Sequence, residues 1–199
     1  MTGGSFPHRC RGCKLPHDLC ICADLPQIDL PLRFVVIQHV GEEHSQSNTG
    51  RLVHRIFTNS ELYDYRVLMR SAKSRSALWA PNTSCAALFS QPGARPVSPE
   101  AIASAPDTPP SLILLDAKWD QARRMSRRIP GLRKLPFVAI PVDDPSQQGG
   151  PQPLRRPLQP GHLSTAEAAY RALAALGYTN AARQLKESFE LLVSRVLHV

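Results

Sequence analysis

Short runs of consecutive apolar residues recur along the chain. In the segments between them, the apolar residues are more widely spaced. Five of these runs have the length and composition of strands: residues 33–39, 65–69, 84–89, 111–115 and 137–140. Proline, glycine or polar residues bound each run, and most are apolar throughout rather than alternating. Continuous apolar strands are typical of a sheet that is buried on both faces.

Helix-start residues stand before several of the remaining segments. They are Asn48 and Thr49 before residues 50–57, Ser98 before Pro99, Ser164 with Glu167 in capping-box form, and Asn180 before the last amphipathic stretch. The helix after Ser164 is expected to end at Leu176, because Gly177 follows. Residues 141–161 contain six prolines and no periodicity, which predicts a long loop. The alternation of strands and helices predicts a mainly parallel α/β sheet with helices on both faces.

Charge then narrows the class of partner. The 199 residues fit one domain with a small appendage, and 24 Lys plus Arg against 16 Asp plus Glu give a net charge of +8. An Arg-rich positive balance favours a polyanionic partner, although an ordinary basic protein has the same balance. No run approaches the roughly 18 apolar residues of a membrane span, and the first residues have no apolar signal core. We therefore expect a cytosolic protein with no membrane partner.

Four cysteines lie close together near the start of the chain: Cys10, Cys13, Cys20 and Cys22. In a reducing compartment such a cluster favours a structural Zn²⁺ site, with four thiolates completing a tetrahedral shell. Disulfides or free thiols are the alternative, and a nearby histidine, His8 or His17, could replace one thiolate. We expect residues 1–30 to form this zinc-binding segment and residues 31–199 to form the main domain.

The strand at 111–115 leads directly into Asp116, and Trp119 follows three residues later. In an open α/β sheet, ligands bind outside the carboxyl ends of the strands, so a carboxylate there is a candidate for the functional site. The alternative is that Asp116 only caps the following helix, since aspartate is a preferred N-cap residue. Trp119 in turn could contact a ligand or belong to the core.

A basic segment follows Asp116. Its cations are Arg123, Arg124, Arg127, Arg128, Arg133 and Lys134. Such a cluster can neutralise several phosphates of a nucleic acid, although a solvated helix face is the commoner explanation of a charge run. Dinucleotide-binding and P-loop glycine motifs are missing from the sequence. The spacing from His39 to His44 does not fit a metalloprotease helix.

Five short motifs stand in order along nearly the whole chain. They are Cys10-x2-Cys13-x2-Pro16-x3-Cys20-Ile21-Cys22, Asn48-Thr49-Gly50-Arg51-Leu52, Leu115-Asp116-Ala117-Lys118-Trp119-x-Gln121-Ala122-Arg123-x-Met125, Leu154-Arg155-Arg156 and Leu163-Ser164-Thr165-Ala166-Glu167-Ala168. Together they resemble the DTW-domain family, which comprises tRNA-uridine aminocarboxypropyltransferases related to the SPOUT class of RNA enzymes. The resemblance implies a knotted, SPOUT-like α/β fold. It also implies transfer of the 3-amino-3-carboxypropyl group of S-adenosylmethionine to N3 of a tRNA uridine, which releases 5′-methylthioadenosine.

The resemblance also assigns roles to residues. Asp116 is the implied general base, because uridine N3 must lose its proton to become a nucleophile. The implied cofactor-binding residues are Leu88, Phe89, Leu114, Leu115, Asp116, Trp119, Leu163, Ser164 and Thr165. The implied RNA contacts are Asn48, Thr49, Arg51, Arg155 and Arg156, beside the basic residues Arg123, Arg124 and Arg127.

One departure from the family pattern concerns the motif that names it. Lys118 stands where the family's Asp-x-Thr-Trp motif has threonine. Two other functions share most of the pattern: methyl transfer to RNA from the same cofactor, and RNA binding by a zinc-stabilised protein without activity. The modified uridine and the oligomeric state cannot be predicted from the chain.

Overall fold

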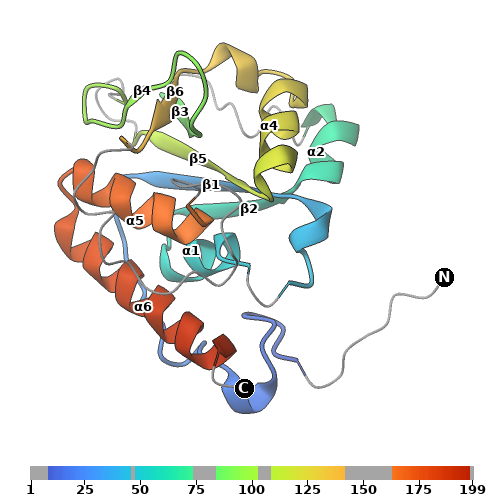
Figure 1. Ribbon diagram of the computed structural model, residues 1–199, viewed down its shortest axis with the longest axis vertical. Coiled ribbons are helices and arrows are strands. Elements are labelled where there is room, and N and C mark those ends of the chain that lie inside the picture. The colour runs from blue at the N-terminus through green and yellow to red at the C-terminus, as the bar shows by residue number, and fades with distance from the viewer. Residues whose placement is uncertain (1–8, 46–47, 74–83, 103–108, 142–162, 198–199) are drawn as a thin grey trace.

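The computed structural model describes residues 9–45, 48–73, 84–102, 109–141 and 163–197 (Figure 1). Its centre is a six-stranded sheet with the order β2-β1-β5-β3-β6-β4, and all of its strand pairs are parallel. The strands are β1 (Arg33–Gln38), β2 (Ser60–Asp64), β3 (Cys85–Leu88), β4 (Arg95–Pro96), β5 (Ser111–Asp116) and β6 (Phe137–Ala139). The predicted parallel α/β class is confirmed.

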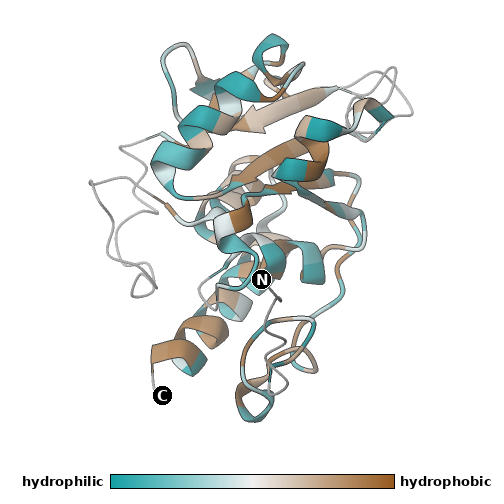
Figure 2. Cartoon of the chain, turned by 90° about the vertical axis from the view of Figure 1, so that its right-hand side faces the viewer, coloured by the Kyte–Doolittle hydropathy of each residue, from teal (hydrophilic) through white to brown (hydrophobic). Residues whose placement is uncertain are grey.

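Helices cover both faces of this sheet. They are α1 (Gly50–Ile56), α2 (Tyr65–Arg70), α4 (Trp119–Arg128), α5 (Thr165–Ala175) and α6 (Thr179–Leu197), with short 3-10 turns η1 (His17–Leu19), η2 (Val40–Glu42) and η3 (Leu132–Lys134). Figure 1 shows α1, α5 and α6 on one side of the strands and α2 and α4 on the other. In Figure 2 the central strands are mainly brown, and teal and brown residues alternate along the helices.

Two hydrophobic cores lie on the two faces of the sheet, because successive side chains of a strand point to opposite sides. Phe34 and Val36 of β1 pack with α1, α5 and α6, whereas Val35 and Ile37 pack with α2 and α4. Strand β5 divides its side chains in the same way, and all six of its residues are buried. Its central position therefore explains the continuous apolar run in the sequence.

The amino-terminal cysteine segment packs on the larger of these cores. Leu15, Ile21 and Leu25 are buried in the same cluster as β1, α1 and α6. A backbone hydrogen bond from Ile28 to the carbonyl of Ile56 joins the segment to the end of α1 at 2.8 Å. The cysteine segment and the sheet thus share one hydrophobic interior.

One predicted strand is wrong. Residues 65–69 form most of helix α2, and strand β2 lies just before it. The Asp64 carboxylate accepts a hydrogen bond from the Arg66 amide at 2.6 Å and so caps α2, where only Leu68 is fully buried. The polar edge strand β2 had no apolar pattern to predict it, since its five residues are all half-buried.

Other expectations have mixed outcomes. The helix after Ser164 is confirmed, and Gly177 ends it with a φ of 85°. The last helix is confirmed as well, but it begins at Thr179, so Asn180 lies in its first turn and not before it. The expected helix after Ser98 is a turn over its described residues. The predicted loop at 141–161 lies almost entirely outside the described residues. The expected knot stays a prediction.

Candidate functional site

The candidate site lies where the chain direction divides at the carboxyl edge of the sheet. Strands β1 and β5 are neighbours and pair from Arg33 opposite Ser111 to Gln38 opposite Asp116. The chain leaves β1 toward α1 on one face, and it leaves β5 toward α4 on the other. Open α/β sheets bind ligands at such a switch point, because the two connections diverge there.

The Asp116 carboxylate occupies this point and is 3% exposed. Its Oδ1 accepts hydrogen bonds from the Gly50 amide at 3.2 Å and from the Thr165 hydroxyl at 2.9 Å. Its Oδ2 accepts from the Gln38 side-chain amide at 3.3 Å and from the Asn48 side-chain amide. Four donors therefore tie β1, β5, the start of α1 and the start of α5 together.

This arrangement excludes the helix-cap explanation of Asp116. Helix α4 begins after Lys118, whose amide donates to the Gln121 side chain at 3.0 Å. The Asp116 side chain points to the α1 and α5 side of the sheet, where all four of its donors lie.

Burial dominates the electrostatics of Asp116. Loss of solvent raises the pKa of its carboxyl group above the ordinary value, and the donors Asn48, Thr165 and Gln38 act in the opposite direction. The nearby Glu42 carboxylate raises the pKa further. A buried carboxyl with a raised pKa is a common feature of functional sites.

The starts of α1 and α5 also contact each other directly. The Ala166 amide donates to the Thr49 hydroxyl at 3.2 Å, and the Glu167 amide donates to the Ser164 hydroxyl at 3.3 Å. Glu167 in turn accepts from the Ser164 amide at 2.8 Å, so the predicted capping box is present. Two amides in the first turn of α5 are therefore used within the protein.

The residues implied for cofactor binding come from three neighbouring segments. Leu88 of β3 pairs with Leu114 of β5, and the start of α5 reaches Asp116 through Thr165. Leu115 is buried on the other face, in the same core as the Phe89 and Trp119 rings, whose centroids are 5.1 Å apart. Leu163 is half-buried just before α5. The structure thus brings these segments together at one edge.

The residues implied for RNA contact fall into two groups. Asn48, Thr49 and Arg51 are buried, and Asn48 and Thr49 bond within the protein. The Arg51 guanidinium donates to the Glu43 carbonyl at 2.7 Å, and its Nη1 has no hydrogen-bond partner among the residues that the structure describes. Burial lowers the pKa of Arg51, against the attraction of Asp116.

The second group is exposed. Arg123, Arg124 and Arg127 lie on the solvent side of α4. Arg155 and Arg156 lie outside the described residues.

Two members of the Asp116 network, Gln38 and Gly50, were not predicted from the sequence. Gly50 stands in the Asn48–Leu52 motif, which was the available signal.

The four predicted metal ligands converge at one place. The Sγ atoms of Cys10, Cys13, Cys20 and Cys22 all lie within 4.8 Å of one another. The Cys10–Cys22 and Cys13–Cys20 sulfur distances are both 3.7 Å. Tetrahedral zinc with Zn–S bonds of 2.3 Å needs sulfurs about 3.8 Å apart, so the residues fit this ion. Bound zinc would have no open position for catalysis and would hold the segment together.

The thiols also form an electrostatically coupled set. Burial acts to raise the pKa of Cys10, but hydrogen bonds from the Cys13 backbone, the Cys20 thiol and the Gly12 backbone together outweigh it and lower that pKa to about 6. Burial and the neighbouring sulfurs raise the pKa of Cys22 to about 12. Bound zinc would stabilise all four sulfurs as thiolates, because thiolates are its preferred ligands.

We predict that the purified protein contains about one zinc ion per chain. Cys13→Ser is expected to lose the metal and to lower the melting temperature, because the zinc segment shares the core of the domain. Elemental analysis and thermal denaturation measure both effects. Cys85→Ala is the control, since Cys85 lies in the other core. Metal-free protein with four freely reactive thiols would refute the site.

Gly50 provides a second prediction. A Cβ atom at this position would lie 2.7 Å from the Asp116 Cβ and closer still to the carboxyl carbon. Gly50→Ala is therefore expected to destabilise the fold by about 2 kcal/mol or more, because neither backbone nor carboxylate can move without breaking the network. Chemical denaturation measures the change. Gly41→Ala is the matched control, since its nearest contact would be an ordinary 3.4 Å.

Among the described residues, no helix combines the length and apolar character that a membrane span needs.

Comparisons with known proteins agree with the resemblance that the motifs indicate. No solved structure matches the chain. The DTW domain matches residues 7–197, which is nearly the whole chain. The chain therefore belongs to the DTW domain family, the family of the tRNA-uridine aminocarboxypropyltransferases, whose members modify tRNA.

Proposed function

We propose that this protein transfers the 3-amino-3-carboxypropyl group of S-adenosylmethionine to N3 of a uridine in tRNA. The observation that carries the proposal is the position of the family motif: Asp116 and Trp119 flank the switch point of the sheet, at the end of β5. Family membership supplies the tRNA substrate class, and the buried carboxylate supplies a group suited to proton transfer.

The reaction needs one bond to form and one to break. Uridine N3 attacks the carboxypropyl methylene beside sulfur, and the C–S bond breaks with its electron pair left on sulfur. The N3 proton passes to a base, and neutral 5′-methylthioadenosine is released. Because the sulfonium is already a good leaving group, the main tasks of the protein are deprotonation and alignment of N3 with this methylene.

Asp116 is our proposed base, and the network limits how it can act. Both of its oxygens already accept two hydrogen bonds, so the uridine N3–H must replace one donor, such as the Thr165 hydroxyl or the Asn48 amide. The raised pKa of Asp116 favours uptake of a proton. In the absence of substrate, the same four donors hold the carboxylate in position.

Cofactor and RNA are proposed to approach from different elements. The segments ending at Leu88 and Leu114, with the Ser164–Thr165 turn, are proposed to hold S-adenosylmethionine. The exposed arginines of α4 are proposed to bind tRNA phosphates. Lys118 is exposed at the start of α4, where an ammonium group is suited to the same task. Zinc, when bound, has a structural role only.

The direct test is incubation of the zinc-loaded protein with unmodified tRNA and S-adenosylmethionine, followed by mass spectrometry of nucleosides and small molecules. We expect uridine carrying the aminocarboxypropyl group together with 5′-methylthioadenosine. S-adenosylhomocysteine as the product would show methyl transfer instead. If the protein binds unmodified tRNA transcripts in a salt-sensitive manner but forms neither product, it is an RNA-binding protein without this activity.

Asp116→Asn tests the base. We expect turnover to fall at least about 100-fold, with little change in the affinity for S-adenosylmethionine. In the wild type, activity should fall as the pH falls through the raised pKa of Asp116, because only the carboxylate accepts a proton. This acidic limb should disappear from the residual activity of the variant.

Asp120→Asn is the matched control, since Asp120 is exposed in the first turn of α4. Its turnover and melting temperature should equal those of the wild type. Melting temperatures are needed for both variants, because an asparagine amide nitrogen cannot accept the bonds that Asp116 accepts. Unchanged turnover in folded Asp116→Asn would show that Asp116 only shapes the sheet edge.

A further inference from the structure

A second concave site lies on the other face of the same sheet edge. It is a cavity of about 260 Å³ between the end of β1, the start of α2 and one side of α4. Its lining residues are His39, Tyr65, Gln121, Arg124, Met125 and Arg128. Sites for drug-sized ligands usually measure roughly 300–1,000 Å³, so this cavity suits a smaller group.

Helix α4 contributes most of the lining because of its spacing. Gln121, Arg124, Met125 and Arg128 are three, four and seven residues apart, which places them on one side of a helix. Met125 is 1% exposed and closes the base of the cavity, whereas both arginines are exposed. The site therefore has an apolar floor and a cationic wall.

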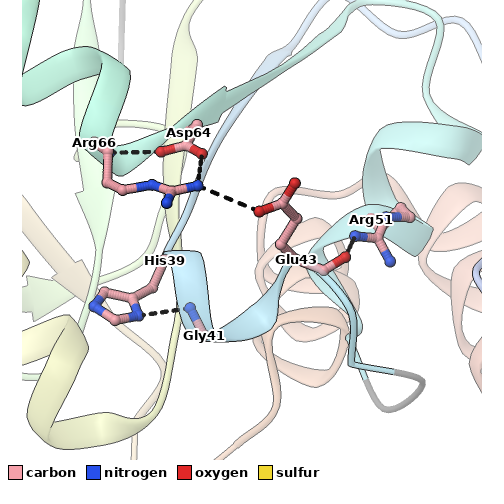
Figure 3. Close-up of polar contacts among 6 residues, drawn as sticks. All are labelled: His39, Gly41, Glu43, Arg51, Asp64 and Arg66. Atoms are coloured by element: carbon pink, nitrogen blue, oxygen red, sulfur yellow. Dashed lines mark hydrogen bonds and ion pairs between the residues drawn. The ribbon is translucent and has the colours of Figure 1, made fainter. Parts of the chain in front are cut away.

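The opposite wall is aromatic. The rings of His39 and Tyr65 are stacked, with centroids 5.8 Å apart and an interplanar angle of 24°. The His39 Nδ1 accepts a hydrogen bond from the Gly41 amide at 3.1 Å (Figure 3), so the neutral ring carries its proton on Nε2. This wall therefore offers the Nε2–H donor of His39 and the faces of two rings.

Polar contacts of the next residue, Arg66, lie beside this wall. Figure 3 shows the Arg66 guanidinium reaching both the Asp64 and the Glu43 carboxylates, at 3.2 and 3.3 Å. The first contact joins α2 to the end of β2, and the second joins it to the turn after η2. Because Tyr65 immediately precedes Arg66, these contacts lie beside the Tyr65–His39 ring pair.

The cationic wall has unused charge. Within the described ranges, neither Arg124 nor Arg128 forms a salt bridge or a side-chain hydrogen bond. Stacked rings suit the face of a nucleobase, and two unpaired guanidinium groups suit a phosphate. The combination of both in one small cavity is typical of a site for a single-stranded nucleotide.

The position of the cavity indicates which nucleotide it would take. The His39 amide donates to the Asp116 carbonyl at 2.9 Å, so the cavity begins one residue from the catalytic edge. Yet the Asp116 carboxylate points to the α1 and α5 face, whereas His39 and α4 lie on the other. A base in the cavity is therefore beside the reacting uridine and does not itself reach Asp116.

We propose that this cavity binds an unpaired nucleotide that neighbours the modified uridine in tRNA. The base stacks on Tyr65 and His39, and its phosphate lies between Arg124 and Arg128. The site would then select a sequence or loop context in which two adjacent nucleotides are unstacked. The proposal rests on the proposed function only for the identity of the reacting uridine.

Binding of an unmodified tRNA transcript to the full-length protein tests the cavity. Tyr65→Leu should weaken the affinity roughly tenfold or more, because it removes a stacking ring, whereas Tyr65→Phe should bind nearly as the wild type does. Arg124→Gln and Arg128→Gln should each weaken binding and reduce the slope of log affinity against log salt, by up to roughly one unit. Melting temperatures identify any variant that is unfolded.

Arg195→Gln is the control for the loss of one surface charge, since Arg195 lies in the last turn of α6. It should leave both the affinity and the salt slope unchanged. Tyr65→Leu with wild-type tRNA affinity would overturn the proposal. If Tyr65→Leu or Arg124→Gln instead lost affinity for S-adenosylmethionine and kept wild-type affinity for tRNA, the cavity would belong to the cofactor and the proposal would be overturned.

These binding measurements also separate the two proposals. Wild-type protein that makes no aminocarboxypropyl uridine, yet loses tRNA affinity on Tyr65→Leu but not on Tyr65→Phe, would refute the reaction and support the nucleotide site. Active protein with equal Michaelis constants for tRNA in the wild type, Tyr65→Leu and Arg124→Gln would support the reaction and refute the site.

Discussion

The buried carboxylate of Asp116 is the constraint on which the carboxyl edge of the sheet depends. Removing an ionised carboxylate from water has a large free-energy cost unless donors replace the lost solvent. Here two side-chain amides, one backbone amide and one hydroxyl replace it. Since these donors come from three separate segments, the end of β1 and the starts of α1 and α5, satisfying one charge on β5 also positions both helix starts.

The sheet separates two tasks by face. The face that carries α1, α5 and α6 holds the Asp116 network, the larger core and the cysteine segment. The face that carries α2 and α4 holds the cavity and the exposed arginines. Both faces meet at the end of β1, where Gln38 contacts Asp116 and His39 lines the cavity. A substrate that spans this edge would contact both.

The sequence predicted those elements whose signals are local. Strands β1, β3, β5 and β6 are largely buried, so each stands out as an apolar run. Strand β2 is half-buried and polar, and the two-residue strand β4 is exposed, so neither has such a pattern. The run at 65–69 was assigned to a strand because short apolar runs do not distinguish strand from helix.

The candidate site was predictable to the same degree. Asp116 and the capping box at Ser164 could be located from neighbouring residues. The contacts of Asp116 with Gly50 and Gln38 join residues 66 and 78 positions apart, which no local pattern indicates. For the same reason, the burial of Arg51 and the cavity beside His39 could only be found in the folded chain.

The order of the strands also affects how the chain folds as it is made. Strand β5 lies between β1 and β3, although both precede it in the sequence. Until residues 111–116 have left the ribosome, β1 and β3 each have an unpaired apolar edge. Such edges are prone to pair with other chains. Insertion of β5 covers both edges in one step, so the centre of the sheet is completed only when this strand is available.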